Sequence, residues 1–124
     1  MSAHIRQGLL RGLVSVVILL EGGAAWAHAA PVHQTPTAGA ELTAPPTEIR
    51  IEFDDALEPA FSSLSVTDSA GHRVNVSKSQ VSPANQKVML LGVPVLPPGA
   101  YRVRWVAVAH DGHRTQGGYA FRVK

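Results

Sequence analysis

Cysteine is absent from the 124-residue sequence. A domain built from this chain therefore has no disulfide bonds and depends on its hydrophobic core, which a chain of this length is large enough to form. The same absence restricts metal chemistry, because any bound ion must be held by nitrogen and oxygen ligands. The composition is otherwise ordinary, with 45% hydrophobic residues, so disordered and collagen-like classes are excluded.

Runs of lysine and arginine are also lacking. The chain holds 11 basic and 9 acidic residues, and loss of the first 27 residues would remove Arg6, Arg11 and Glu21. The remaining charge would be close to neutral, and no stretch of it would follow a phosphate backbone. We therefore expect no nucleic-acid partner.

No apolar run reaches the roughly 20 residues that a membrane span needs. Residues 1–27 instead combine the basic residues Arg6 and Arg11 with a short apolar segment, 13–20, and end in the small-x-small sequence Ala-Trp-Ala. This order is typical of a secretory signal peptide that is cleaved after Ala27. We predict that cleavage leaves residues 28–124 as one exported domain without membrane insertion; an uncleaved anchor helix is the alternative.

Helical periodicity is missing from residues 28–124, whereas apolar and polar residues alternate repeatedly. In residues 48–53, Ile49, Ile51 and Phe53 share one face, which predicts a half-buried antiparallel strand. Residues 28–47 are expected to form an extended lead-in with turns. The other predicted elements are a hairpin with strands at Leu64–Val66 and Val74–Val76 and a turn at 68–71, and strands over 87–91, 101–107 and 119–123.

Short strands separated by proline and glycine turns predict an all-β fold. We expect an immunoglobulin-like Greek-key β-sandwich of about seven strands, in a single domain, with a small barrel as the alternative. Tyr101 follows the sequence Leu-Pro-Pro-Gly-Ala. Its position resembles the tyrosine corner of such sandwiches, in which the hydroxyl bonds back to the upstream turn.

The strand that contains Tyr101 runs into a polar loop, His110-Asp111-Gly112-His113. On an extended backbone, residues two apart point to the same side, so Asp111 and His113 can offer a carboxylate and an imidazole to one metal ion. His110 would point to the opposite side. A simple turn is the alternative interpretation, because Asp and Gly favour turns for their own reasons.

A second set of ligands arises if the leader is cleaved after Ala27, because His28 then begins the chain. Its free α-amine and its imidazole can chelate one ion, and nitrogen ligands in a square plane suit Cu(II). With Asp111 and His113, the site would contain three nitrogens and one oxygen. The amine must lose its proton to bind, so affinity should fall in acid. An N-terminal histidine left there without a function is the alternative.

Three stretches of the sequence resemble the CopC family of periplasmic copper-resistance proteins. They read HAAPVHQTPTAGAEL, IRIEFDDAL and LPPGAYRVRWVAVAHDGHRTQGGYAFRV, and the resemblance extends over essentially all of residues 28–124, with its weakest part between Phe61 and Val95. It implies an immunoglobulin-like sandwich that binds Cu(II) in the periplasm for sequestration, carriage or resistance, and that is not an enzyme.

The resemblance also implies particular residues and partners. The implied ligands are His28, Asp111 and His113, and Asp55 is implied as an additional ligand or as a partner that orients an imidazole. A separate CopD-type inner-membrane copper transporter is the implied protein partner. Some relatives hold Cu(I) in a methionine-rich loop, but Met89 is the one methionine after the leader and lies in an apolar strand pattern, so we expect Cu(II) alone.

Two other functions stay open at this point. An N-terminal histidine that chelates copper also resembles the histidine brace of lytic polysaccharide monooxygenases, which would make the protein an oxidative copper enzyme. A structural or adhesive sandwich without metal is the other alternative. Zn(II) could occupy the same ligands as Cu(II). His33, His72 and His110 are interpreted as solvated surface residues.

Overall fold

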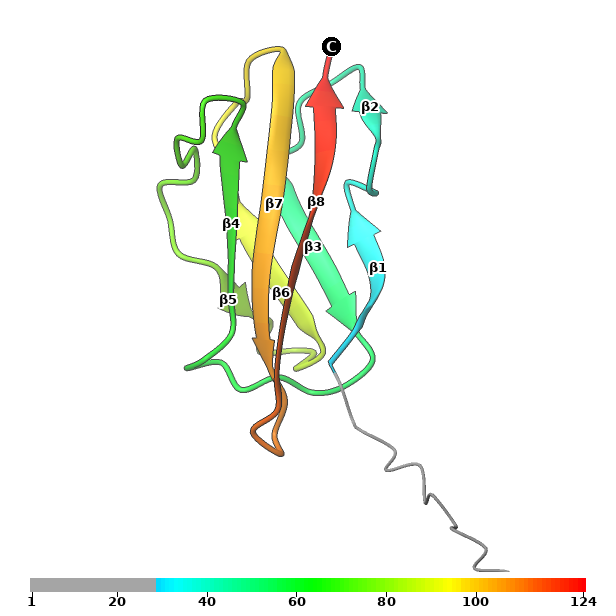
Figure 1. The fold of residues 1–124 in the computed structure, drawn as a ribbon, viewed down its shortest axis with the longest axis vertical. Coiled ribbons are helices and arrows are strands. Elements are labelled where there is room, and N and C mark those ends of the chain that lie inside the picture. The colour runs from blue at the N-terminus through cyan, green and yellow to red at the C-terminus, as the bar shows by residue number, and fades with distance from the viewer. Residues whose placement is uncertain (1–28) are drawn as a thin grey trace, which may run out of the picture.

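The computed structural model describes residues 29–124, which form two four-stranded β-sheets (Figure 1). The predicted signal peptide and His28 lie outside the described residues. The described part contains no helix that is long and apolar enough to cross a membrane. The strands are β1 (Pro31–Thr35), β2 (Glu41–Leu42), β3 (Glu48–Phe53), β4 (Ser63–Asp68), β5 (Gln80–Val81), β6 (Val88–Gly92), β7 (Gly99–Val108) and β8 (Arg114–Val123).

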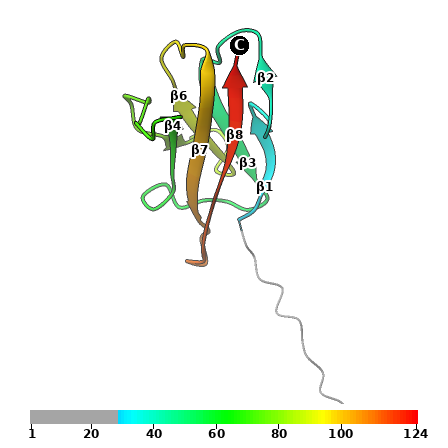
Figure 2. The same cartoon turned by 45° about the horizontal axis from the view of Figure 1, so that its top comes forward.

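The two sheets pack face to face, as Figure 2 shows from a second direction. One sheet has the strand order β1-β3-β6-β5 and the other has the order β2-β8-β7-β4. All pairs are antiparallel except β2 with β8. The predicted all-β sandwich is confirmed. It has eight strands, and the two shortest, β2 and β5, contain two residues each.

The core is formed by the alternating apolar residues that predicted the strands. In β3 these are Ile49, Ile51 and Phe53, and in β7 and β8 they are Tyr101, Val103, Trp105, Ala107, Tyr119, Phe121 and Val123, all of which are buried. Phe53 and Trp105 meet edge to face across the two sheets, with ring centroids 5.2 Å apart. Met89 is fully buried in β6, which confirms that it packs in the core.

Tyr101 forms the predicted link to the turn before its strand. Its hydroxyl donates a hydrogen bond to the carbonyl of Pro97 at 2.5 Å. Its ring stacks on Phe121 of the neighbouring strand. The predicted tyrosine-corner hydrogen bond is thus confirmed. Together with the stacked ring, it holds the first residues of β7 in place.

The predicted return strand at Val74–Val76 is wrong. The turn at 68–71 forms, with the Asp68 carboxylate accepting hydrogen bonds from the following backbone. The return begins with an isolated bridge between Thr67 and Arg73 and a hydrogen bond from Val74 N to Val66 O at 2.9 Å, but no strand forms. From Asn75 onward side chains replace the ladder: Asn75 Oδ1 accepts from Val66 N at 3.0 Å, and Ser79 Oγ accepts from Leu64 N at 2.8 Å. Val76 is 91% exposed as a result.

The lead-in is more regular than expected. β1 pairs along β3, and β2 runs parallel to the end of β8. Between them lies the predicted turn, in which Ala40 N donates to Thr37 O and Gly39 adopts a φ of 75°. The start of the described chain is therefore fastened to the sandwich.

Candidate metal site at the β7–β8 end

The loop between β7 and β8 is a tight turn at one end of the sandwich. Ala109 N donates to His113 O at 3.0 Å, and Gly112 N donates to Ala109 O at 2.9 Å. Gly112 has a φ of 87°, a left-handed conformation that glycine adopts without steric penalty. These bonds fix the backbone that carries Asp111 and His113.

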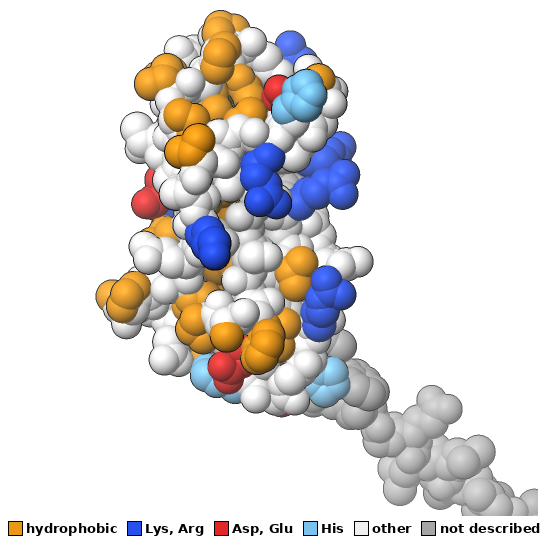
Figure 3. Space-filling model, turned by 90° about the vertical axis from the view of Figure 1, so that its left-hand side faces the viewer, with side chains coloured by type: hydrophobic (Ala, Val, Ile, Leu, Met, Phe, Trp, Pro, Cys, Tyr) orange, Lys and Arg blue, Asp and Glu red, His pale blue; other side chains and the backbone are white. Residues whose placement is uncertain are grey.

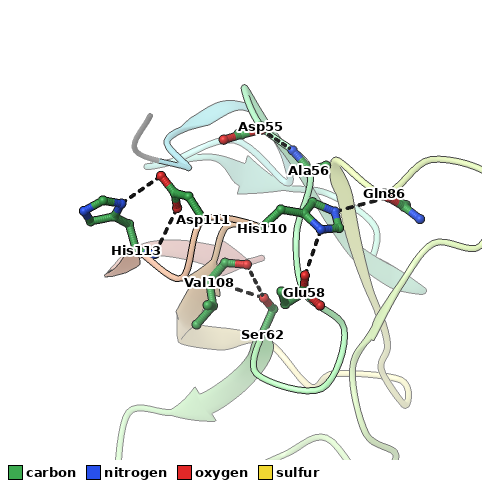
Figure 4. A network of polar contacts seen from close by, with 9 residues as sticks. All are labelled: Asp55, Ala56, Glu58, Ser62, Gln86, Val108, His110, Asp111 and His113. Carbon is green, nitrogen blue, oxygen red and sulfur yellow. Dashed lines mark hydrogen bonds and ion pairs between the residues drawn. The ribbon is translucent and has the colours of Figure 1, made fainter. Parts of the chain in front are cut away.

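Asp111 and His113 come together as the sequence predicts (Figure 4). One Asp111 oxygen, Oδ1, accepts a hydrogen bond from His113 N at 3.0 Å, and the other, Oδ2, lies 2.8 Å from His113 Nδ1. Hydrogen bonds from the His113 backbone, and then from its ring, hold the pKa of Asp111 below its ordinary value. The carboxylate is therefore ionised at neutral pH, and it can accept a hydrogen bond from an imidazole N–H or bind a cation.

The two groups are close enough to contact one ion. The 2.8 Å between Asp111 Oδ2 and His113 Nδ1 is the length of their hydrogen bond, so an ion would have to replace the hydrogen between them. Both side chains are partly exposed, at 41% and 43%, so an ion can reach them from solvent. Binding would exchange the shared proton for the metal.

His110 points to the other side of the loop, as expected from alternation (Figure 4). Its Nδ1 lies 2.8 Å from Glu58 Oε1, and its Nε2 lies 3.3 Å from Gln86 Oε1. His110 is therefore exposed but not merely solvated, because it ties the loop to two other segments. The sequence carries no signal for these contacts, since both partners are far along the chain.

The residues from Leu57 to Ser62 also brace this end. Leu57 forms a bridge with Ala109, and Glu58 N donates to Val108 O at 2.8 Å. Ser62, which is buried, accepts a hydrogen bond from Val108 N at 3.0 Å. The β7–β8 loop thus follows a strand whose last residues are held by a neighbouring segment.

The start of the described chain lies at the same end of the molecule (Figure 1). Ala29 is completely buried, and its carbonyl accepts a hydrogen bond from Thr115 Oγ1 at 2.7 Å. Ala30 N donates to Asp54 Oδ1 at 2.8 Å, and Asp54 N donates to Ala30 O at 2.9 Å. Ala29, which follows His28 in the sequence, is therefore bound to Thr115, and Thr115 is two residues after His113 in the chain.

Asp55 does not join the pair in this structure. Its carboxylate accepts a hydrogen bond from Ala56 N at 2.8 Å, and in Figure 4 it points toward that residue. Its neighbour Asp54 instead holds the start of the chain, a role that sequence reasoning missed. Nothing in the pattern distinguishes the two adjacent aspartates, because both follow the same strand.

Two histidines remain. His33 is exposed on β1 opposite Glu52, and His72 lies in the turn after β4, where its ring is 3.8 Å from Asp68 and 80% exposed. Within residues 29–124, no group of three or more His, Asp or Glu side chains is arranged to hold a metal ion. Asp111 and His113 are thus a pair of candidate ligands and not a complete site within this part of the chain.

Fold and site together define a class of protein: a small β-sandwich that presents an imidazole and a carboxylate beside the start of its chain. The family model for the CopC domain matches residues 31–124. The chain belongs to the CopC family.

Curated relatives agree with this assignment. Protein YobA of Escherichia coli K12 is 37% identical over 102 residues, which are 80% of this chain and 81% of that protein. Copper resistance protein C of Escherichia coli is 31% identical and covers 81% of this chain and 84% of its own. Copper transport protein CutJ of Bacillus subtilis is 33% identical over 99 residues, which make up only 18% of that longer protein.

Solved structures show the same fold. CopC from Methylosinus trichosporium OB3b matches with a TM-score of 0.73 and 32% identity, over 78% of this chain and 94% of that one. PcoC, a methionine-rich copper resistance protein from Escherichia coli, matches with a TM-score of 0.67 and 33% identity, over 79% and 100%.

Proposed function

We propose that this protein binds Cu(II) in the periplasm and sequesters or carries it without chemical turnover. Its family and its relatives, which are named for copper resistance and copper transport, support a copper-related role. A separate CopD-type transporter in the inner membrane would be the protein that exchanges copper with it.

The observation that carries the proposal is the hydrogen bond from Thr115 Oγ1 to the carbonyl of Ala29. Consecutive Cα atoms are about 3.8 Å apart, so holding Ala29 beside β8 keeps any group on residue 28 near the β7–β8 loop. If the leader is cleaved after Ala27, the α-amine and imidazole of His28 would then be within reach of Asp111 and His113.

These groups form a donor set that suits Cu(II). The amine, the His28 imidazole and the His113 imidazole would supply three nitrogens, and Asp111 would supply one oxygen. Nitrogen and oxygen ligands in a square plane favour Cu(II), which also binds most tightly among the divalent first-row metals. With Asp111 in the fourth position, the plane would be filled, which favours storage of the ion over oxygen chemistry.

The test is a Cu(II) titration of the chain that begins at His28, with its N-terminus checked by mass spectrometry. One added glycine before His28 should weaken binding by orders of magnitude, because the amine then moves away from the imidazole. The matched control carries the same glycine after Lys124 and should bind as the parent does. Electron paramagnetic resonance should report three nitrogen ligands in the parent and fewer in the extended chain.

Two substitutions complete the test. His113→Ala should weaken Cu(II) binding strongly, whereas His72→Ala should leave it unchanged, because His72 lies in the turn after β4. Equal affinity of the parent and the chain with the added N-terminal glycine would rule out the proposed ligand set.

A further inference from the structure

The outer face of the second sheet carries a group of arginines that the copper site does not use. β7 buries Tyr101, Val103 and Trp105, so the residues between them, Arg102 and Arg104, face outward and are exposed. On β8 the same alternation exposes Arg122. We refer to Arg102, Arg104 and Arg122 as the arginine face.

The register brings these three side chains close together. Arg102 and Arg104 are two residues apart on one strand, which separates their Cα atoms by roughly 7 Å. Arg102 lies opposite Ala120, and Arg122 lies opposite Ala100, so Arg122 is a diagonal neighbour of Arg102. Diagonal neighbours are also separated by roughly 7–8 Å. A cluster of like charges therefore forms from residues that are scattered in the sequence.

None of the ion pairs found within residues 29–124 includes Arg102, Arg104 or Arg122. Two acids do lie near the cluster. Glu41 is the cross-strand partner of Arg122 but pairs with Lys124 at 3.5 Å. Asp68 lies beside Arg102 and Arg104 but uses its carboxylate on the backbone of its own turn. In Figure 3, which looks at the β4 edge, blue side chains gather in the right-hand half of the view. The face thus has a local positive charge that the overall composition hides.

A shallow groove runs along this face. It is lined by Ser63, Ser65, Arg102, Arg104, Gln116 and Gly118, together with Trp105. A second hollow shares Arg102 and Arg104 and continues past Thr67 and Ala120 to Asp68, which is its one acidic residue. Every polar side chain in the first groove can donate a hydrogen bond, and none of them is acidic.

Gly118 keeps the floor of the groove at the level of the backbone. A Cβ at this position would lie 2.6 Å from the carbonyl oxygen of Val103, so no side chain fits without moving the strand. Its cross-strand partner is Arg104, whose Cγ would be 3.7 Å from that Cβ. An extended chain can therefore approach the sheet between flanking guanidinium groups.

We propose that the arginine face binds an extended acidic segment of a partner protein, with carboxylates at alternate positions. Alternate side chains of an extended chain repeat at roughly 7 Å, which is the spacing of Arg102 and Arg104. Guanidinium groups bind carboxylates through two parallel hydrogen bonds, so each arginine selects one carboxylate. The proposal does not depend on the copper site, which lies on the β7–β8 loop.

A protein segment fits this surface better than a lipid membrane does. Proteins that lie on membranes combine basic residues with apolar side chains that enter the bilayer. The large apolar side chains that are exposed in residues 29–124 are Val32, Phe61, Val76 and Val95. None of them lines the groove.

The test measures binding of a labelled peptide of alternating Asp and Thr to the chain that begins at His28, by fluorescence anisotropy at low salt. An Asn–Thr peptide serves as the neutral control. Replacing both Arg102 and Arg104 by Gln should weaken binding of the acidic peptide roughly tenfold. Replacing both Lys78 and Lys87 by Gln changes the net charge equally and should change binding less than twofold.

Two further measurements keep the outcome interpretable. Unchanged thermal unfolding and Cu(II) affinity of the Arg102→Gln/Arg104→Gln variant would show that its fold and copper site are intact. Amide NMR shifts caused by the acidic peptide should map to β4, β7 and β8. Equal loss in the two double variants, or binding to phosphatidylglycerol vesicles without binding to the peptide, would overturn the proposal.

Discussion

Two buried tyrosines differ in a way that makes them a matched pair. Tyr101 donates its hydroxyl hydrogen to Pro97 O, whereas the hydroxyl of Tyr119 is buried and has no hydrogen-bond partner within residues 29–124. Burying a hydroxyl without a partner costs about 1–3 kcal/mol, and a satisfied one contributes about 1 kcal/mol. The same chemical change should therefore have opposite effects at the two positions.

We predict that Tyr119→Phe leaves the free energy of unfolding unchanged or raises it by about 1 kcal/mol, whereas Tyr101→Phe lowers it by about 1–2 kcal/mol. Urea unfolding of both variants measures these values. Equal losses in the two variants would show that the Tyr119 hydroxyl has a partner in solution.

The pH dependence of stability gives a second measurement on the same residue. Burial raises the pKa of Tyr119 from 10.0 to about 12. The unfolded chain therefore binds fewer protons than the folded one between these values, so stability is complete below about pH 10 and falls as pH rises toward 12. The Tyr119→Phe variant should lack this part of the alkaline loss.

At the scale of the element, the β7–β8 hairpin decides how the candidate ligands are presented. Gly112 adopts a φ of 87°, and Gly39, in a turn between β1 and β2, adopts a φ of 75°. In both places a Cβ would meet no neighbouring atom within 4 Å, so only backbone strain opposes a side chain.

We predict that Gly112→Ala and Gly39→Ala each lower the free energy of unfolding by about 1–2 kcal/mol. Only Gly112→Ala should weaken Cu(II) binding, since it alone changes the turn that carries Asp111 and His113. Thermal unfolding and Cu(II) titration of both variants check the pair. Equal copper affinity in the two variants would count against a site on this loop.

Strands could be predicted from the sequence where buried and exposed residues alternate over several positions. β3, β7 from Tyr101 onward and the second half of β8 bury every second residue, so alternation marked them clearly, whereas the exposed first half of β8 was not predicted. β5 has only two residues, which is too short for a period to be visible. The segment at Val74–Val76 alternates too, but Asn75 satisfies the backbone of β4 with its side chain, and composition does not reveal that competition.

At the scale of the whole molecule, the sandwich brings distant parts of the chain to one end. Asp111 and His113 were predicted as a pair from their spacing of two residues on an extended backbone, but a turn brings them together, with Gly112 left-handed and His113 N donating to Asp111 Oδ1. The contact between Ala29 and Thr115 spans 86 residues and depends on how β8 packs beside the start of the chain. No local pattern reports such a contact, so Thr115 and Asp54 emerged only from the structure.

Thr115→Val tests whether this long-range contact serves the proposed copper site. Valine keeps the shape of threonine but cannot donate to Ala29 O, so the buried carbonyl loses its partner at 2.7 Å. Freed from β8, the N-terminal ligands would have to be ordered again whenever copper binds. We predict roughly tenfold weaker Cu(II) binding, mainly through faster dissociation measured by stopped-flow transfer to a chelator.

The matched control is Thr67→Val, on β4 of the same sheet, which should leave copper dissociation unchanged. Both variants should remain folded, because β8 keeps its full pairing with β7. If Thr115→Val released copper as slowly as the parent, the hydrogen bond to Ala29 would stabilise the fold without contributing to copper binding. The amine of His28 would then have to reach Asp111 and His113 without help from β8, and the sandwich would support the site only through the β7–β8 hairpin.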